Sequence, residues 1–252
     1  MWFPLLFLAI FIGCKNSEVK PKITSGKSKI EKPKSHEIFG YRFEIEGDFD
    51  GDGKSEKLTE HYWDTDTNKE TFKFRDDLEY GDLIQWTDKR NTDAFVLSSN
   101  PEIDSLKIGN SLCFGLHLLK NDGDLNGDGN DEISLVIDHA DFSSCNSWRI
   151  YTYQNGKWKE LFKFDILEWQ LPQLPDATGE YGLFGTSGKV SIPKQDKANI
   201  ELENQLKAWP GLVRKIGKNQ IQAIFRNEQA DEDTMTVNLI TMKIKRRKPE
   251  FE

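Results

Sequence analysis

The sequence has few of the residues that usually carry chemistry, with only three cysteines and four histidines among 252 residues. It contains no HExxH zinc motif, no phosphate-binding glycine loop and no nucleophile elbow, so three common enzyme classes find no support. Outside the first residues it has no long apolar run, and the mean hydropathy is −0.65, which excludes a bundle of transmembrane helices. Basic residues number 34 against 42 acidic ones, and the net charge of −8 argues against nucleic acid as a partner.

The one long apolar run stands at the start of the chain, from Trp2 to Ile12. These residues are too few to span a bilayer and are typical of the apolar region of a signal peptide. The run continues as Phe11, Ile12, Gly13 and Cys14, which resembles the lipobox of bacterial lipoproteins. The resemblance implies a signal peptide over residues 1–13, lipidation such as palmitate at Cys14, and a place at the bacterial outer membrane. A buried N-terminal strand with an incidental cysteine is the alternative.

Residues 14–36 form a lysine-rich segment that cannot bury a core. Seven lysines, two glutamates and two prolines lie between residues 15 and 36, which gives this part a charge of +5. We expect a flexible tether between the lipid anchor and a folded domain over residues 37–252, whose charge is then −13 (−8 minus +5). The tether could also contact anionic lipid headgroups, although a solvated tail that contacts nothing explains it equally well.

The two remaining cysteines, Cys113 and Cys145, make an even pair. In the oxidising compartment that a lipid anchor implies, a disulfide between them is expected. Two buried thiols are the alternative.

The pattern of apolar residues after residue 37 repeats mainly with a period of two, as in half-buried strands. Asn155-Gly156 between aromatic-rich flanks predicts a tight hairpin. Residues 62–110 read as loop-rich with weak strands, and a short helix is expected over 196–209, ended by Pro210. The fold class is therefore all-β, either propeller-like or a sandwich, with little helix. The segments with the strand period are 39–47, 112–118, 132–137, 218–227 and 234–247.

Two Asp-rich loops have the same pattern, GDFDGDGKSE at 47–56 and GDLNGDGNDE at 123–132. Counted from the first aspartate, positions 1, 3, 5 and 9 carry carboxylate or amide oxygens in both copies, and position 6 is glycine. Ca²⁺ prefers six to eight oxygen ligands, and glycine allows a sharp turn around the ion. A polar hairpin turn without an ion is the alternative.

An EF-hand does not fit these loops, because position 12 is Thr59 or Leu135 instead of glutamate and the flanks read as strands. The loops resemble the calcium loop of integrin-type FG-GAP repeats, also called VCBS repeats, which usually build β-propeller blades. The resemblance implies two Ca²⁺ sites, with a structural role for each ion. Their ligands would be Asp48, Asp50, Asp52, Lys54 (carbonyl) and Glu56, and Asp124, Asn126, Asp128, Asn130 (carbonyl) and Glu132.

The expected function is that of a calcium-stabilised, non-catalytic envelope lipoprotein that binds a protein or a polysaccharide. Six tryptophans after residue 37 could pack the core or form binding platforms. The alternative is a surface hydrolase or lyase for glycans or phosphoesters, with Asp138, His139 and Asp141 as acid and base. The basic run KIKRRK at 243–248 reads as a solvated strand end.

Overall fold

The computed structural model describes residues 36–109, 112–174, 197–226 and 231–246. The expected signal peptide (1–13), the lipidation site Cys14 and nearly all of the tether (14–36) lie outside these residues. Within them the protein is all-β, as the sequence predicted, with the strands arranged in antiparallel sheets. No helix in the described parts of the chain is long and apolar enough to cross a membrane.

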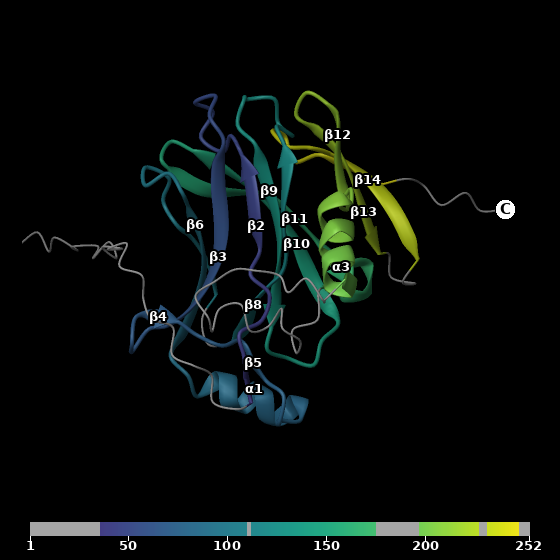
Figure 1. Cartoon of the computed structure of the whole chain (residues 1–252). Coiled ribbons are helices and arrows are strands. Elements are labelled where there is room, and N and C mark those ends of the chain that lie inside the picture. The colour runs from purple at the N-terminus through teal and green to yellow at the C-terminus, as the bar shows by residue number, and fades with distance from the viewer. Residues whose placement is uncertain (1–35, 110–111, 175–196, 227–230, 247–252) are drawn as a thin grey trace, which may run out of the picture.

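Three sheets make up most of the fold (Figure 1). The first holds β2 (Glu44–Gly47), β3 (Glu56–Asp64), β4 (Lys69–Glu70), β6 (Thr92–Ser98) and β7 (Leu106–Gly109). The second holds β8 (Cys113–Gly123), β9 (Glu132–His139), β10 (Cys145–Gln154) and β11 (Lys157–Leu167). The third holds β12 (Val213–Gly217), β13 (Gln220–Arg226), β14 (Glu232–Asn238) and β15 (Ile244–Arg246). A small pair, β1 (Glu37–Ile38) and β5 (Phe74–Arg75), adds the last two strands of the described residues.

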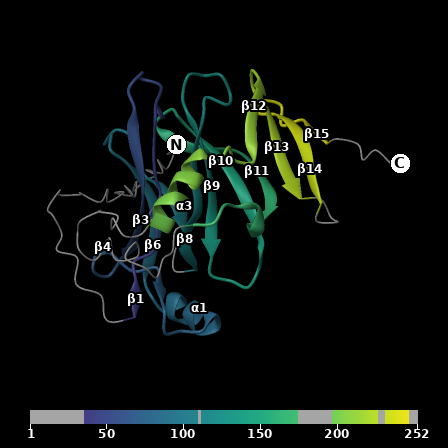
Figure 2. The same cartoon turned by 45° about the vertical axis from the view of Figure 1, so that its right-hand side comes forward.

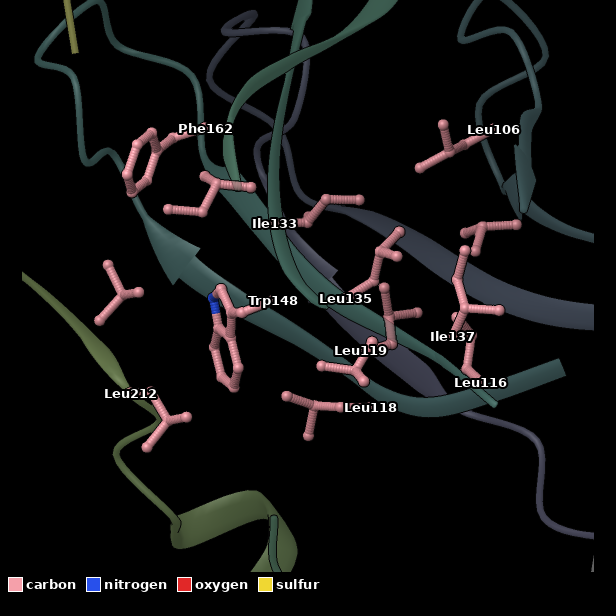
Figure 3. Close-up of a cluster of buried hydrophobic side chains, with 14 of the residues drawn as sticks. Leu106, Leu116, Leu118, Leu119, Ile133, Leu135, Ile137, Trp148, Phe162 and Leu212 are labelled. Atoms are coloured by element: carbon pink, nitrogen blue, oxygen red, sulfur yellow. The ribbon is translucent and has the colours of Figure 1, made fainter. Parts of the chain in front are cut away.

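The second sheet lies in the middle of the molecule, between the other two (Figure 2). None of the sheets formed by the described residues closes into a barrel, and the arrangement is like that of a sandwich. All three sheets contribute to one hydrophobic core, part of which is drawn in Figure 3. The six residues Glu132–Ile137 of β9 are all buried, because this strand is covered on both faces. The predicted inward row of Ile133, Leu135 and Ile137 is therefore confirmed, but its polar counterpart is buried too.

The predicted alternation in β8 is only partly confirmed, since Phe114, Leu116 and Leu118 of the expected inward row are buried. Cys113, Phe114, Gly115 and Leu116 are all buried, and Leu112 is exposed. The register between β8 and β9 shifts at several points, and each bulge moves the following side chains to the other face. A strict period of two therefore fails along this strand.

The structure also corrects the expected disulfide between Cys113 and Cys145, which is not formed. Cys113 of β8 is paired with His139 of β9, whereas Cys145 lies at the start of β10 on the other side of β9. Two strand spacings amount to about 9.6 Å, beyond the roughly 7 Å that a disulfide can span between Cα atoms. Burial raises the pKa of the Cys113 thiol to about 11, whereas Cys145 is exposed.

Two helices and one hairpin test the local predictions. α3 (Lys197–Ala208) ends just before Pro210, as expected, and Asn155 and Gly156 form the tight β10–β11 turn with φ of 55° and 76°. α1 (Tyr80–Asp88) lies in the stretch that was expected to be only loop and weak strand. A single turn of 3-10 helix, η1 (Glu168–Gln170), follows β11.

Candidate metal centre

The first Asp-rich loop connects β2 to β3 and is shaped by its own aspartates. The Asp48 carboxylate accepts hydrogen bonds from the backbone N–H groups of Gly51 and Gly53, both at 2.9 Å. Gly51 and Gly53 have φ of 76° and 83°, a conformation that favours glycine. The Asp50 carboxylate accepts from the N–H of Asp52 at 3.1 Å. Glycine and aspartate therefore curl the backbone so that the side chains turn inward.

Four carboxylates of this loop converge: oxygens of Asp48, Asp50, Asp52 and Glu56 all lie within 4.8 Å of one another. We call these four residues the carboxylate cluster. Two unit charges at that separation repel by about 0.9 kcal/mol in water and by more near a protein surface. Such a cluster is costly without a cation. Its hard oxygen donors, with the Lys54 carbonyl in the same loop, are the ligand type that Ca²⁺ prefers, so the residues present fit a calcium ion.

Lys54 places a positive charge beside the carboxylate cluster. Its Nζ lies 2.7 Å from Asp52 Oδ2, although the side chain is exposed. Hydrogen bonds from this side chain and from its backbone N–H lower the pKa of Asp52. The carboxylate cluster therefore carries one internal counter-charge, which offsets only part of its repulsion.

Glu56 and Glu132, at position 9 of the two loops, have equivalent surroundings. Both are buried, and each accepts a hydrogen bond from the residue at position 2 of its loop, Phe49 N at 3.0 Å and Leu125 N at 2.7 Å. Burial raises the pKa of Glu56, with a further contribution from Asp50, Asp48 and Asp52. Burial likewise raises the pKa of Glu132 to about 7. The two loops are thus structural repeats as well as sequence repeats.

The second loop, between β8 and β9, does not gather its ligands in the same way. Asn126 directs its amide nitrogen to Glu132 Oε1 at 2.8 Å and to Asp128 Oδ2 at 3.0 Å, while its oxygen accepts from the N–H of Asp128. These carboxylates are therefore held by a donor within the loop. Asp124, Asp128 and Glu132 form no cluster like that of the first loop.

Lys215, from β12 of the third sheet, also reaches the second loop. Its ammonium donates to the Asp124 carbonyl and lies 3.7 Å from Asp124 Oδ2. A lysine thus supplies positive charge at position 1 of the second loop. A cation there would compete both with this lysine and with the amide of Asn126.

The two loops lie side by side and are joined by residues that the sequence did not single out. The backbone N–H of Asp131 donates to the Asp48 carbonyl at 2.7 Å, and the Asp131 carboxylate accepts from the N–H of Asp48 at 3.2 Å. Asn121 donates to Asp131 Oδ2 and to the carbonyl of Glu46. The joined loops connect the first sheet to the second, so a fixed conformation of one loop stabilises the conformation of the other.

The side chain of Asn130 is turned away from the second loop, but its backbone carbonyl can still be the predicted ligand. Its amide nitrogen donates to the carbonyl of Tyr153 at 2.8 Å, which leaves the backbone carbonyl as the atom predicted to ligate. Asn100, from the loop after β6, donates to Asp50 Oδ2 at 3.0 Å. Residues from β10 and from the loop after β6 therefore contact the two Asp-rich loops from outside.

The alternative site of Asp138, His139 and Asp141 is not assembled as an acid and base pair. Asp138 Oδ1 lies 3.2 Å from Nε2 of His117 on the neighbouring strand, and Glu168 Oε1 lies 3.4 Å from the same nitrogen. Burial alone would lower the pKa of His117, but the hydrogen bond that His117 donates to Asp138 and the two negative charges outweigh it and raise the pKa. The Asp141 carboxylate accepts the N–H of Ser143 in its own turn.

His139 is not part of the ion pair of His117 and Asp138. It lines a shallow cavity of about 450 Å³ with Cys145 and Asp165. Of the tryptophans in the described residues, only Trp169 is strongly exposed, and Trp148 is fully buried in the core (Figure 3). Most of the tryptophans therefore serve packing. Comparison of the chain with protein-family models, with curated proteins and with solved structures finds no match.

Proposed function

We propose that this chain is a calcium-stabilised, non-catalytic lipoprotein of a bacterial envelope, anchored through Cys14, whose β domain binds a protein or a polysaccharide. The observation that carries the proposal is the carboxylate cluster, which brings four acidic side chains together at the tip of one hairpin. The lipid anchor rests on the sequence around Cys14.

The ion would have a structural role. When bound, Ca²⁺ would neutralise the repulsion within the carboxylate cluster and hold the tip of the β2–β3 hairpin. Through Asp48 and Asp131 the first loop is hydrogen-bonded to the second, so the ion would also stabilise the contact between two sheets. A bound ion stabilises the folded chain by about 2.7 kcal/mol at a hundred times its Kd.

The two predicted calcium sites would be unequal. In the second loop, Asn126 would have to rotate its amide so that the oxygen faces the carboxylates, and this would break its hydrogen bonds to Glu132 and Asp128. Each such bond is worth about 1 kcal/mol. Lys215 would also have to yield its place beside Asp124. We therefore propose that the first loop fills at lower Ca²⁺ concentration than the second.

Thermal unfolding of the full chain in EDTA, in millimolar Ca²⁺ and in millimolar Mg²⁺ tests the proposed cofactor. We expect a higher Tm in Ca²⁺ and a smaller rise in Mg²⁺, since Mg²⁺ gives up its water reluctantly. Equal melting curves in all three conditions would exclude a structural ion.

The non-catalytic role is tested separately with His139→Ala. We expect the variant to fold and to behave as the wild-type chain on a panel of glycans and phosphoesters. Turnover by the wild type that disappears in this variant would establish the hydrolase alternative instead.

A further inference from the structure

The third sheet ends in a tip that is both basic and apolar. The β12–β13 turn and the β14–β15 turn lie at the same end of this sheet, and the N–H of Leu239 donates to the Asn219 carbonyl at 2.9 Å, which joins the two turns. In Figure 1 the β12–β13 turn lies at the same end of the molecule as the loop between β2 and β3. We call the following residues the basic tip: Ile216, Lys218, Ile240, Met242, Lys243 and Ile244.

The apolar side chains of the basic tip are unusually exposed. Ile216, Ile240, Met242 and Ile244 have exposed fractions of 47%, 70%, 46% and 49%. They make up four of the eight large apolar side chains that are exposed in the described residues. Such grouping of exposed apolar side chains marks an interaction surface, because single exposed ones are ordinary but clusters are rare.

The β14–β15 turn presents these side chains at some cost. Met242 has φ of 54°, a left-handed conformation that disfavours a side chain such as methionine. The Asn238 side-chain oxygen accepts hydrogen bonds from the N–H groups of Ile240 and Thr241, which fixes the turn. The turn therefore holds Ile240 and Met242 outward in a defined geometry instead of burying them.

The charge of the third sheet is strongly asymmetric. Residues 212–226 and 234–246 contain seven lysines and arginines and no aspartate or glutamate. The carboxylates within the third sheet and just before it, Asp231, Glu232 and Asp233, lie at the start of β14, at the opposite end from the two turns, whereas Asp124 of the second loop lies beside Lys215. Lys215 is turned toward Asp124 of the second loop and the Lys218 side chain lies against Gly127 of the same loop, so Lys218 and Lys243 carry the positive charge of the basic tip.

We propose that the basic tip docks on an anionic phospholipid surface, with its aliphatic side chains in the interfacial layer and its lysines among the headgroups. This pairing of aliphatic and basic side chains is the composition of segments that lie in membrane interfaces. No aromatic side chain is exposed on β12–β15, whereas single-stranded nucleic acids bind on aromatic platforms. The inference goes beyond the proposed calcium role and does not require an ion in either loop.

Hydrogen–deuterium exchange of the full chain with vesicles tests this surface, in EDTA so that calcium cannot bridge protein and lipid. Phosphatidylcholine vesicles are compared with vesicles that also contain phosphatidylglycerol. We expect slower exchange at 217–219 and 239–243 only with phosphatidylglycerol, and restoration of the exchange rate in high salt. Unchanged exchange at both turns would overturn the proposal.

Variants in the basic tip distinguish its contribution to vesicle binding from that of the N-terminal segment. Every chain compared carries the same N-terminal segment, so a difference between chains reports on the basic tip. Lys218→Gln and Lys243→Gln should each weaken partition into the anionic vesicles by about fivefold, whereas Lys163→Gln on β11 should not. Ile240→Ser and Met242→Asn should abolish the slowed exchange at the turns, and asparagine suits the positive φ at 242. The matched control is Phe142→Ser, which removes an exposed ring from the β9–β10 turn.

An acidic polymer is the competing partner, and soluble dextran sulfate tests for it. If dextran sulfate slows exchange at the two turns as strongly as the vesicles do, and Ile240→Ser leaves the effect intact, the surface recognises polyanions and the membrane proposal is wrong. If dextran sulfate has little effect at the two turns and Ile240→Ser abolishes the protection by vesicles, the lipid surface is supported.

Discussion

The substitution Asp50→Asn should change the stability of the chain in opposite directions with and without calcium. In the carboxylate cluster Asp50 faces three other carboxylates within 4.8 Å. Each of the three pairs costs about 0.9 kcal/mol in water, so removing one charge relieves about 2.7 kcal/mol before salt screening. The hydrogen bond from Asn100 to Asp50 Oδ2, at 3.0 Å, would be lost at a cost of about 1 kcal/mol. The variant should therefore be more stable than the wild type in EDTA, by about 1 kcal/mol.

In calcium the same substitution removes one charged ligand. The wild-type chain gains about 2.7 kcal/mol at a hundred times Kd, and the variant should lose most of that gain. The order of the two melting temperatures should therefore reverse. For a chain of this size each kcal/mol corresponds to about 2–4 °C in Tm. Thermal unfolding of the full chain followed by circular dichroism, in EDTA and in millimolar Ca²⁺, measures both values.

Asp66→Asn is the matched control, because the Asp66 carboxylate also sits in a loop and accepts hydrogen bonds from an asparagine, Asn91, at 3.0 and 3.1 Å. It belongs to no carboxylate cluster and should respond equally in the two conditions. A shift of Asp50→Asn with the same sign in both conditions would refute the electrostatic reasoning. So would a control that also reversed.

Three further predictions concern buried and exposed groups elsewhere. Lys73→Met should destabilise the chain by about 3–5 kcal/mol in urea unfolding, because it leaves the fully buried Glu60 without the counter-ion that lies 2.6 Å from it. Adding Glu60→Gln to this variant should recover part of the lost stability. If the double variant recovers none of it, the explanation is contradicted. The raised pKa of His117 means that its contribution to stability is fully present below its ordinary pKa of 6.5 and is lost as pH rises through the folded value. His117→Gln should therefore destabilise the chain more at pH 5.5 than at pH 8.5, and an equal effect at both would argue against the ion pair. A maleimide should label Cys145 in the folded chain and Cys113 only after unfolding, as mass spectrometry would show, whereas a chain with neither thiol reactive would indicate a disulfide.

Much of the fold followed from local sequence patterns. The period of two predicted the all-β class, Asn155-Gly156 predicted the β10–β11 hairpin, and Pro210 marked the end of a helix. These features depend on residues that are close in sequence. The curl of the first loop is likewise local, since it depends on its glycines and on Asp48.

Features that depend on partners distant in sequence were not predictable. Nothing in the spacing of the second loop shows that Lys215, 91 residues after Asp124, would supply a positive charge there. Asp131 is one acidic residue among many until the two loops are seen side by side. The predicted disulfide is wrong because the number of cysteines gives no information about the strand that lies between Cys113 and Cys145. α1 was missed because the few apolar residues of its short sequence give only a weak helical signal.

Equilibrium dialysis of the full chain against radioactive Ca²⁺ tests the central claim most directly. It compares the wild type with Asp48→Asn in the first loop and Asp128→Asn in the second. We predict two unequal sites, the stronger with a Kd of about 10⁻⁴ to 10⁻³ M. Asp48→Asn should remove the stronger site, and Asp128→Asn should leave it in place. No bound calcium in the wild type, or a stronger site that survives Asp48→Asn, would contradict a metal centre at the carboxylate cluster.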